Sequence, residues 1–216
     1  MNNINFKKIV VCLTLYITSL FATNTLGVKL MPFLFGTHLS VAIFSYPIIF
    51  IMTDVIGEVY GRKMAKNFVF AGVISLVLFI FYSAISSLMP WSNDGLWVKD
   101  GYNQIFSLSV RFSVASLVAF IIAEYQDVFS FFFFKNKWGN KYFWLRSNLS
   151  NIWSQLLDSV IFMIIAYWGV IPLKAIMLII IPWWIYKVLL GFLYTPISYL
   201  GLYLLKEKKY NENTTN

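Results

Sequence analysis

Apolar residues form long runs along this chain, and polar residues gather in short clusters between them. Each run is roughly 20 residues long, the length that a helix needs to cross about 30 Å of hydrocarbon. Six spans are predicted, approximately Ile9 to Val28, Leu39 to Val59, Phe68 to Leu88, Gln104 to Ala123, Asn148 to Tyr167, and one within Lys174 to Leu205. A β-barrel is not expected, because it would show alternating segments of about ten residues. The pattern predicts an all-α, polytopic membrane protein with one domain over residues 1–216.

The fourth and sixth apolar regions do not fit a simple span. The sixth is too long for one untilted helix and contains Pro182, so we expect a kink there or a short half-helix at its start. The fourth runs on to Phe134 through Glu124 and Asp127, which indicates a helix that continues into the cytoplasmic interface. The aromatic run 129–134 is then expected to anchor at that interface.

Composition and charge agree with a membrane protein. Of the 216 residues, 59% are hydrophobic and 12% charged, about half the charged fraction of a soluble domain. The predicted inner segments hold most of the 17 basic residues, at Lys7, Lys8, Arg62, Lys63, Lys66, Lys135, Lys137, Lys141, Arg146, Lys206, Lys208 and Lys209. Because cytoplasmic loops carry the excess of lysine and arginine, both termini are predicted to be cytoplasmic, with 206–216 as a polar tail. The net charge of +8 follows from this topology and needs no nucleic acid partner.

Several functional classes are disfavoured by the residues present. With one cysteine, Cys12, and one histidine, His38, the chain offers neither an internal disulfide nor a Cys/His metal site. We therefore expect no metal and no cofactor. An integral-membrane enzyme is disfavoured, because no set of nucleophile and base, or of metal ligands, can be assembled.

Four ionisable residues interrupt the predicted spans, namely Asp54, Arg111, Asp158 and Lys187. A charge in an apolar helix is costly unless it faces protein or water, so these residues indicate a polar cavity inside the bundle. Asp158 and Lys187 fall at similar predicted depth and make the most economical ion pair in the chain. A purely structural ion pair is the alternative interpretation.

The fifth span carries a polar stripe. Asn148, Asn151, Gln155 and Asp158 follow at steps of three, four and three, which places them on one side of a helix, and Phe162 continues the stripe. A stripe of this kind either lines a site or forms hydrogen bonds that hold helices together. We favour a site, because amides alone would suffice to hold the helices.

The second and fourth spans also present inward faces. Pro47, Asp54 and Glu58 share one side of the second span, where the proline is able to kink the helix. Glu58 is predicted to lie at a solvated helix end. Gly57 and Gly61 have the spacing of small residues that lets another helix approach closely; the alternative is that Gly61 only ends the helix. In the fourth span Arg111 precedes three alanines spaced by four residues, so we expect it to point inward.

Several spaced motifs together resemble the bacterial queuosine-precursor transporters of the vitamin uptake transporter family. They are FSYPIIFIMTDVIGEVYG (44–61), Arg111 with FSVAS after it, Asp127, WLRSNLSNIWSQLLDSVIF (144–162) and YKVLLGFLYTP (186–196). The resemblance covers nearly the whole chain in the right order. The residues that match the family pattern are Asn24, Pro47, Asp54, Arg111, Asp127, Asp158, Lys187 and Pro196.

The resemblance implies a six-helix protein of the bacterial inner membrane that imports 7-deazaguanines, such as 7-cyano-7-deazaguanine, 7-aminomethyl-7-deazaguanine or queuine, for insertion into transfer RNA. A carboxylate can accept the ring N–H and amine of such a molecule, while a lysine, arginine or amide donates to its carbonyl. The expected contacts to substrate or to a coupled ion are Asp54, Arg111, Asn151, Gln155, Asp158, Phe162 and Lys187. Structural or gating roles are expected for Asn24, Pro47, Asp127, Pro182 and Pro196.

Aromatic stacking partners are expected among Phe162, Trp153, Trp168, Trp184 and Tyr186. The substrate site itself is expected to lie between the second, fifth and sixth spans. The alternative is the substrate-binding subunit of an energy-coupling-factor vitamin importer. Such subunits carry an Ala-xxx-Ala motif in the first helix, whereas Ile9 to Val28 holds only Ala22. A dedicated ATPase is therefore not expected, and homo-oligomerisation is left open.

Overall fold

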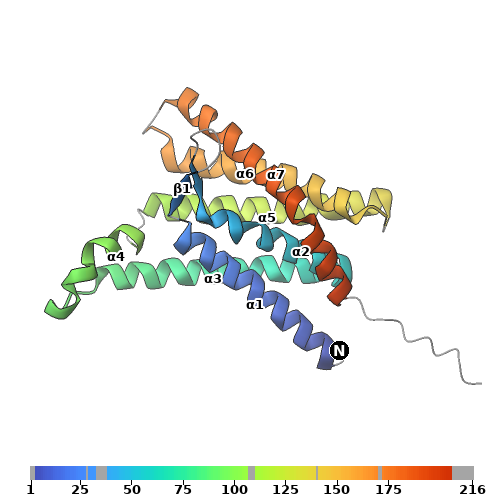
Figure 1. Ribbon diagram of the computed structural model, residues 1–216, viewed down its shortest axis with the longest axis horizontal. Coiled ribbons are helices and arrows are strands. Elements are labelled where there is room, and N and C mark those ends of the chain that lie inside the picture. Colours follow the sequence, from blue (N-terminus) through green and yellow to red (C-terminus); the bar gives the residue numbers. More distant parts are fainter. Residues whose placement is uncertain are drawn as a thin grey trace, which may run out of the picture.

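A computed structural model describes residues 3–27, 29–32, 38–106, 110–139, 141–169 and 172–205 as a helical bundle (Figure 1). The helices are α1 Asn3–Leu26, α2 Tyr46–Tyr60, α3 Arg62–Leu88, α4 Lys99–Phe106, α5 Val110–Trp138, α6 Phe143–Tyr167 and α7 Leu173–Leu205. Short 3-10 turns precede α2 (η2, Val41–Phe44) and α4 (η3, Asn93–Val98). Among the described residues, six segments are long and apolar enough to cross a membrane, which confirms the predicted six-span, all-α fold.

Helix α2 lies in the middle of the bundle, where it contacts α1, α3, α5, α6 and α7 (Figure 1). Its residues from Ile49 to Gly57 are buried on every side, because helices surround it. A side chain at Gly57 would meet the Phe132 ring of α5 at 3.2 Å, so glycine permits this close approach. Gly61 ends the helix with φ +86°, a conformation that favours glycine, and α3 begins at the next residue.

Two short strands were not predicted. They are β1 Leu30–Pro32 and β2 His38–Ser40, which pair antiparallel between α1 and η2, with Met31 opposite Leu39. The pairing hydrogen-bonds backbone groups that would otherwise have no partner outside a helix. It also links the end of α1 to the start of the α2 segment.

The fourth span begins later than the sequence indicated. Gln104 belongs to the separate short helix α4, and the membrane-length apolar segment is Val114–Trp138 within α5. The expected interfacial position of Glu124 and Asp127 was wrong, since other helices bury both completely. The aromatic run is divided: Phe131 is buried against Phe143, whereas Phe129 and Phe133 are exposed as an anchor would be.

Three prolines lie within the described helices, and none of them separates its helix into two. Helix α7 is one continuous helix of 33 residues that includes Pro182 and Pro196, so it has no separate half-helix at its start. Pro47 is in the first turn of α2, where its missing N–H would have no helical partner. Pro47 therefore fits the start of α2 without the kink that a proline is able to cause inside a helix.

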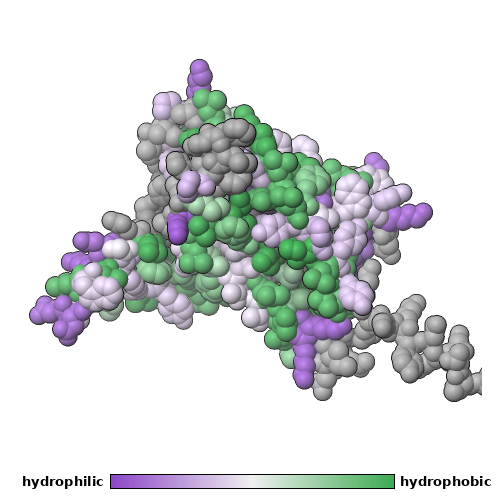
Figure 2. Space-filling view, in the orientation of Figure 1, coloured by the Kyte–Doolittle hydropathy of each residue, from purple (hydrophilic) through white to green (hydrophobic). Residues whose placement is uncertain are grey.

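The outer surface suits a lipid environment. Figure 2 shows hydrophobic residues over the middle of the visible face and hydrophilic residues mainly toward its ends. Large apolar side chains such as Phe81, Leu193 and Leu204 are more than half exposed. An apolar surface of this extent is typical of a membrane interface, so the polar residues of the core face protein.

Candidate functional site: a pocket between α2, α6 and α7

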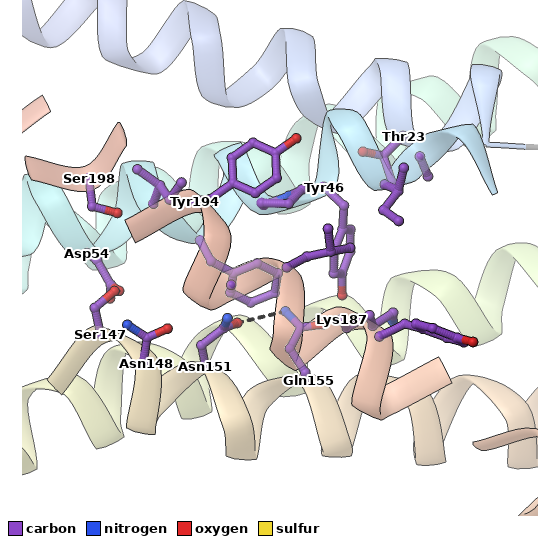
Figure 3. Close-up of a pocket in the computed structure, with 18 of the residues that line it drawn as sticks. Thr23, Tyr46, Asp54, Ser147, Asn148, Asn151, Gln155, Lys187, Tyr194 and Ser198 are labelled. Carbon is purple, nitrogen blue, oxygen red and sulfur yellow. Dashed lines mark hydrogen bonds between the residues drawn. The ribbon is translucent and has the colours of Figure 1, made fainter. Parts of the chain in front are cut away.

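A cavity of about 180 Å³ lies between α2, α6 and α7, with Thr23 of α1 at one side (Figure 3). Its aromatic wall is formed by Tyr46, Phe50, Trp183, Tyr186 and Tyr194. Its polar groups are Asp54 of α2, Ser147, Asn148, Asn151 and Gln155 of α6, and Lys187 and Ser198 of α7. A mostly apolar cavity in which a few polar groups converge is the usual form of a small-molecule site.

The amide stripe of α6 faces this cavity (Figure 3). Asn148 Nδ2 donates to the Trp144 carbonyl at 2.7 Å and to Thr195 Oγ1 of α7 at 2.9 Å. Gln155 Nε2 donates to Asn151 Oδ1 at 3.0 Å, while Gln155 Oε1 is buried and has no hydrogen-bond partner among the described residues. The stripe therefore has two functions: Asn148 joins α6 to α7, and Gln155 offers an acceptor.

Gly191 lets α7 approach the Asn151 amide. A Cβ at this glycine would overlap Asn151 Nδ2 and would also approach Asn148 Oδ1. The absence of a side chain on α7 thus sets the position of the amide that lines the pocket. The sequence motif YKVLLGFLYTP contains this glycine, but only the packing of two helices shows its purpose.

The predicted ion pair between Asp158 and Lys187 is present. Lys187 Nζ donates to Asp158 Oδ2 at 2.7 Å, and the two side chains are 20% and 17% exposed for Lys187 and Asp158 respectively. Lys187 Nζ also lies 4.7 Å from the centre of the Tyr46 ring, a cation–π contact. Lys187 lines the cavity, whereas Asp158 holds the lysine from behind.

Asp54 is the carboxylate that faces the cavity directly. It is 3% exposed and accepts a hydrogen bond from Ser147 Oγ of α6. On its other side lies Asp127 of α5, close enough to share a hydrogen bond when one of the two acids carries a proton. Asp127 Oδ1 accepts from Ser154 Oγ at 3.1 Å. The sequence placed Asp54 inside the bundle correctly but did not indicate that Asp127 is its neighbour.

The sequence predicted a solvated helix end for Glu58, and this prediction was wrong. Its side chain is 6% exposed and accepts two hydrogen bonds from Arg146, both at 3.1 Å, and one ion pair from Lys135 at 2.9 Å. Arg146 is fully buried, with its guanidinium 5.1 Å from the Phe131 ring centre. These three residues, the Glu58–Lys135–Arg146 network, join α2, α5 and α6 one turn beyond the pocket.

Other predicted site residues have different positions. The side chain of Arg111 lies outside the described part of the structure, whereas Ala115, four residues beyond it on α5, is fully buried as expected. Phe162 is on α6 beyond the pocket wall. Asn24 accepts a hydrogen bond from Ser116 Oγ of α5 at 3.4 Å and so links α1 to α5. Pro47 lines the cavity at the start of α2.

Most of the aromatic side chains predicted as stacking partners lie away from this pocket. Of the five candidates only Tyr186 lines the pocket, while Trp153 and Trp168 are more than half exposed on the outer surface. Trp184 instead donates to the Ile152 carbonyl at 3.0 Å. The aromatic wall comes chiefly from α2 and from the face of α7 that also carries Lys187. A helical count from Lys187 would have reached Trp183, Tyr194 and Gly191, since these lie three or four residues apart along that face.

Most of this chain is similar in sequence to known membrane transporters. The family model described as "Putative vitamin uptake transporter" matches residues 40–201. A protein of Bacillus subtilis (strain 168) named "Probable queuosine precursor transporter" is 29% identical over 168 residues, which cover 77% of this chain and 72% of that protein.

A second relative is the "Queuosine precursor transporter" of Escherichia coli (strain K12). It is 30% identical over 142 residues, which cover 65% of this chain and 61% of that protein. No solved structure shows significant similarity to the chain. Because the family model spans most of the sequence, including α2, α5, α6 and nearly all of α7, this multi-pass membrane protein belongs to the vitamin uptake transporter family.

Proposed function

We propose that this protein imports queuosine precursors, 7-deazaguanines such as 7-cyano-7-deazaguanine, 7-aminomethyl-7-deazaguanine or queuine, for salvage into transfer RNA. The observation that carries the proposal is the pocket between α2, α6 and α7, in which a buried carboxylate and an amide pair face an aromatic wall. The names of the two relatives support the same substrate class.

The pocket offers matching groups to a flat heterocycle of this kind. Asp54 can accept the ring N–H and the exocyclic amine side by side, and Gln155 Oε1 is a further acceptor. Lys187 supplies a positive donor for the ring carbonyl. Tyr46, Phe50 and the aromatic residues of α7 supply faces on which the ring can stack. A cavity of about 180 Å³ is smaller than the ~300–1,000 Å³ of drug-sized sites and suits a small two-ring molecule.

The orientation of the pocket across the membrane follows from the predicted topology. With both termini in the cytoplasm, the pocket's Thr23 and Ile43 end lies toward the outside. The Glu58–Lys135–Arg146 network then lies between the pocket and the cytoplasm, where it holds α2, α5 and α6 together. Release into the cell requires that this network separate. Pro182 and Pro196, which each remove a backbone hydrogen bond from α7, are points at which that helix can bend.

The partners in this proposal are the substrate and the lipid bilayer. The protein works without a dedicated ATPase and makes no direct contact with nucleic acid. Purified protein in liposomes tests both the substrate and this independence: it should exchange labelled 7-cyano-7-deazaguanine for unlabelled molecules inside, with no ATP present. Exchange that appears only after an ATPase module is added would instead support the energy-coupling-factor alternative.

A cellular assay tests the salvage role. A bacterial strain that lacks both precursor synthesis and its own importer should regain queuosine in its transfer RNA when this protein is expressed and a precursor is supplied at low concentration. Asp54→Asn, expressed to the same level, is the matched control that should not restore it. If neither the exchange assay nor this restoration detects any of the three 7-deazaguanines, the proposed substrate class is wrong.

A further inference from the structure

Three carboxyl groups lie together in the core behind the pocket. Asp54 of α2 faces the cavity, and Asp127 of α5 contacts it from the far side. Glu124, one turn earlier on α5, is the third. They are 3%, 0% and 0% exposed respectively, so neither bulk water nor lipid headgroups reach them.

The neighbours of these acids supply hydroxyl groups and no positive charge. Ser147 donates to Asp54, and Ser154 donates to Asp127 Oδ1, both from α6. Asp127 Oδ2 and both oxygens of Glu124 have no hydrogen-bond partner among the described residues. The hydroxyl of Tyr16 on α1 is fully buried, also lacks a partner within hydrogen-bond geometry there, and faces Glu124.

Every described cation nearby is engaged elsewhere. Lys187 pairs with Asp158, and Lys135 and Arg146 pair with Glu58. The remaining titratable groups that face the cluster are Tyr16 of α1, Tyr46 of α2 and Asp158 of α6, none of which is a cation.

Two adjacent carboxylates cannot both remain ionised in such a site. Each charge would be buried without a cation, and the two would repel each other at hydrogen-bond distance. A proton between Asp54 and Asp127 removes one charge and supplies the donor that the pair lacks. A metal ion does not fit equally well, because within the described residues no group of three or more acids, histidines or cysteines is arranged to hold one.

We propose that the Asp54–Asp127 pair is the proton-binding site that couples substrate uptake to the proton gradient. The proposal rests on the proposed transport function. The packed arrangement of α2, α5 and α6 requires one proton on the pair, whereas opening of the bundle would hydrate both acids and release it. Proton binding therefore favours one conformation over the other, which is the condition for coupling.

The position of Asp54 joins the proton to the substrate. When a substrate donates its N–H groups to Asp54, that acid must be ionised, and the shared proton rests on Asp127. Glu124 and Tyr16 extend the buried polar groups along α5 and α1 toward the predicted outer side, and we assign them to the proton's entry path.

Asp127→Asn separates coupling from transport. The asparagine amide reproduces the shape and the donor of a protonated acid, so it can still bond to Asp54, but it cannot release a proton. Asp127 does not line the pocket. Liposomes with purified protein should show exchange of labelled 7-cyano-7-deazaguanine with either wild type or Asp127→Asn. Asp100→Asn, an exposed acid on α4, is the matched control.

The decisive measurement is accumulation under an acid-outside pH gradient, with the membrane potential held at zero. At one proton per neutral substrate, a gradient of one pH unit supports up to about tenfold accumulation. Wild type and Asp100→Asn should accumulate substrate above the level without a gradient, and Asp127→Asn should fall to that level. Gradient-driven accumulation by Asp127→Asn, or none by wild type, would overturn the coupling proposal.

Two further outcomes are distinguishable. Absence of exchange by the wild type would overturn the proposed transport function and the coupling with it. If Asp127→Asn does not fold, the coupling is tested with the wild type alone. Substrate uptake that carries protons inward should make a weakly buffered external medium more alkaline. Exchange without that alkaline shift during net uptake would overturn proton coupling while leaving the transport function intact.

Discussion

Removal of Arg146 should destabilise the bundle far more than removal of Lys135, although both bases bind the same acid. Arg146 is fully buried, donates two hydrogen bonds to Glu58 and makes cation–π contacts with the rings of Phe131 and Phe143. Lys135 makes a shorter ion pair with Glu58 but is 20% exposed. Burial, rather than distance, is expected to decide the cost.

The magnitudes follow from what each substitution leaves behind. In Arg146→Met the carboxylate of Glu58 keeps only one cation in a buried site, and breaking such a pair costs about 3–5 kcal/mol. Because Lys135 remains, we expect a value near the lower limit, about 3 kcal/mol. In Lys135→Met the bidentate arginine remains and the lost amine was partly hydrated, so we expect about 1 kcal/mol or less.

Equilibrium unfolding of the purified protein in mixed detergent micelles measures both free energies. The double variant Arg146→Met/Glu58→Leu should recover much of the loss, since apolar residues can replace a buried ion pair without large cost. The reasoning would be refuted if Lys135→Met cost as much as Arg146→Met, or if Arg146→Met cost less than about 1 kcal/mol.

Three further predictions concern the pocket. Asp54→Asn should reduce uptake on the order of tenfold or more without unfolding the protein, because asparagine replaces one of the two acceptor oxygens by an NH2 donor, which opposes one of the substrate's N–H groups; uptake and thermal unfolding check this, and full uptake would exclude Asp54 from recognition. Gly191→Ala should lower uptake by displacing the Asn151 amide, whereas Gly201→Ala, whose Cβ would meet Val55 at an ordinary 3.4 Å, should be tolerated; equal uptake by the two variants would contradict the pocket geometry. Lys187→Met should destabilise the protein by about 1–3 kcal/mol, and a second change, Asp158→Leu, should recover part of that in detergent unfolding. A double variant no more stable than Lys187→Met would show that the ion pair is not the source of the loss.

Helical spacing correctly predicted where several polar side chains lie. Asn148, Asn151 and Gln155 were placed on one face by their steps along the helix, and the structure puts all three on the pocket wall. Asp158 and Lys187 were paired because the apolar runs set their depths, and the ion pair is formed. Such inferences need only the rise and turn of a helix and the cost of a charge in hydrocarbon.

Two of the predictions failed for the same reason. The sequence put Glu58 at a solvated helix end and Glu124 in a stretch of helix that continues into the cytoplasmic interface. Two bases from α5 and α6 instead cover the Glu58 side chain, which is 6% exposed, and Glu124 is fully buried among α1 and α5 side chains. The position of an acid along its own helix does not show which other helix covers it.

Hydrophobicity and helical periodicity, which are properties of each segment alone, were sufficient to determine the number of spans, the polar face of the fifth span and the matching depth of Asp158 and Lys187. Only the tertiary structure decided the partners of the other two acids of the inward faces. Glu58 meets Arg146, and Asp54 meets Asp127, neither of which was paired from the sequence, whereas the Asp158–Lys187 pair was. The physical reason is that the environment of a buried charge is set by side chains from neighbouring helices, distant in sequence, whose rotation and register arise only when the bundle packs.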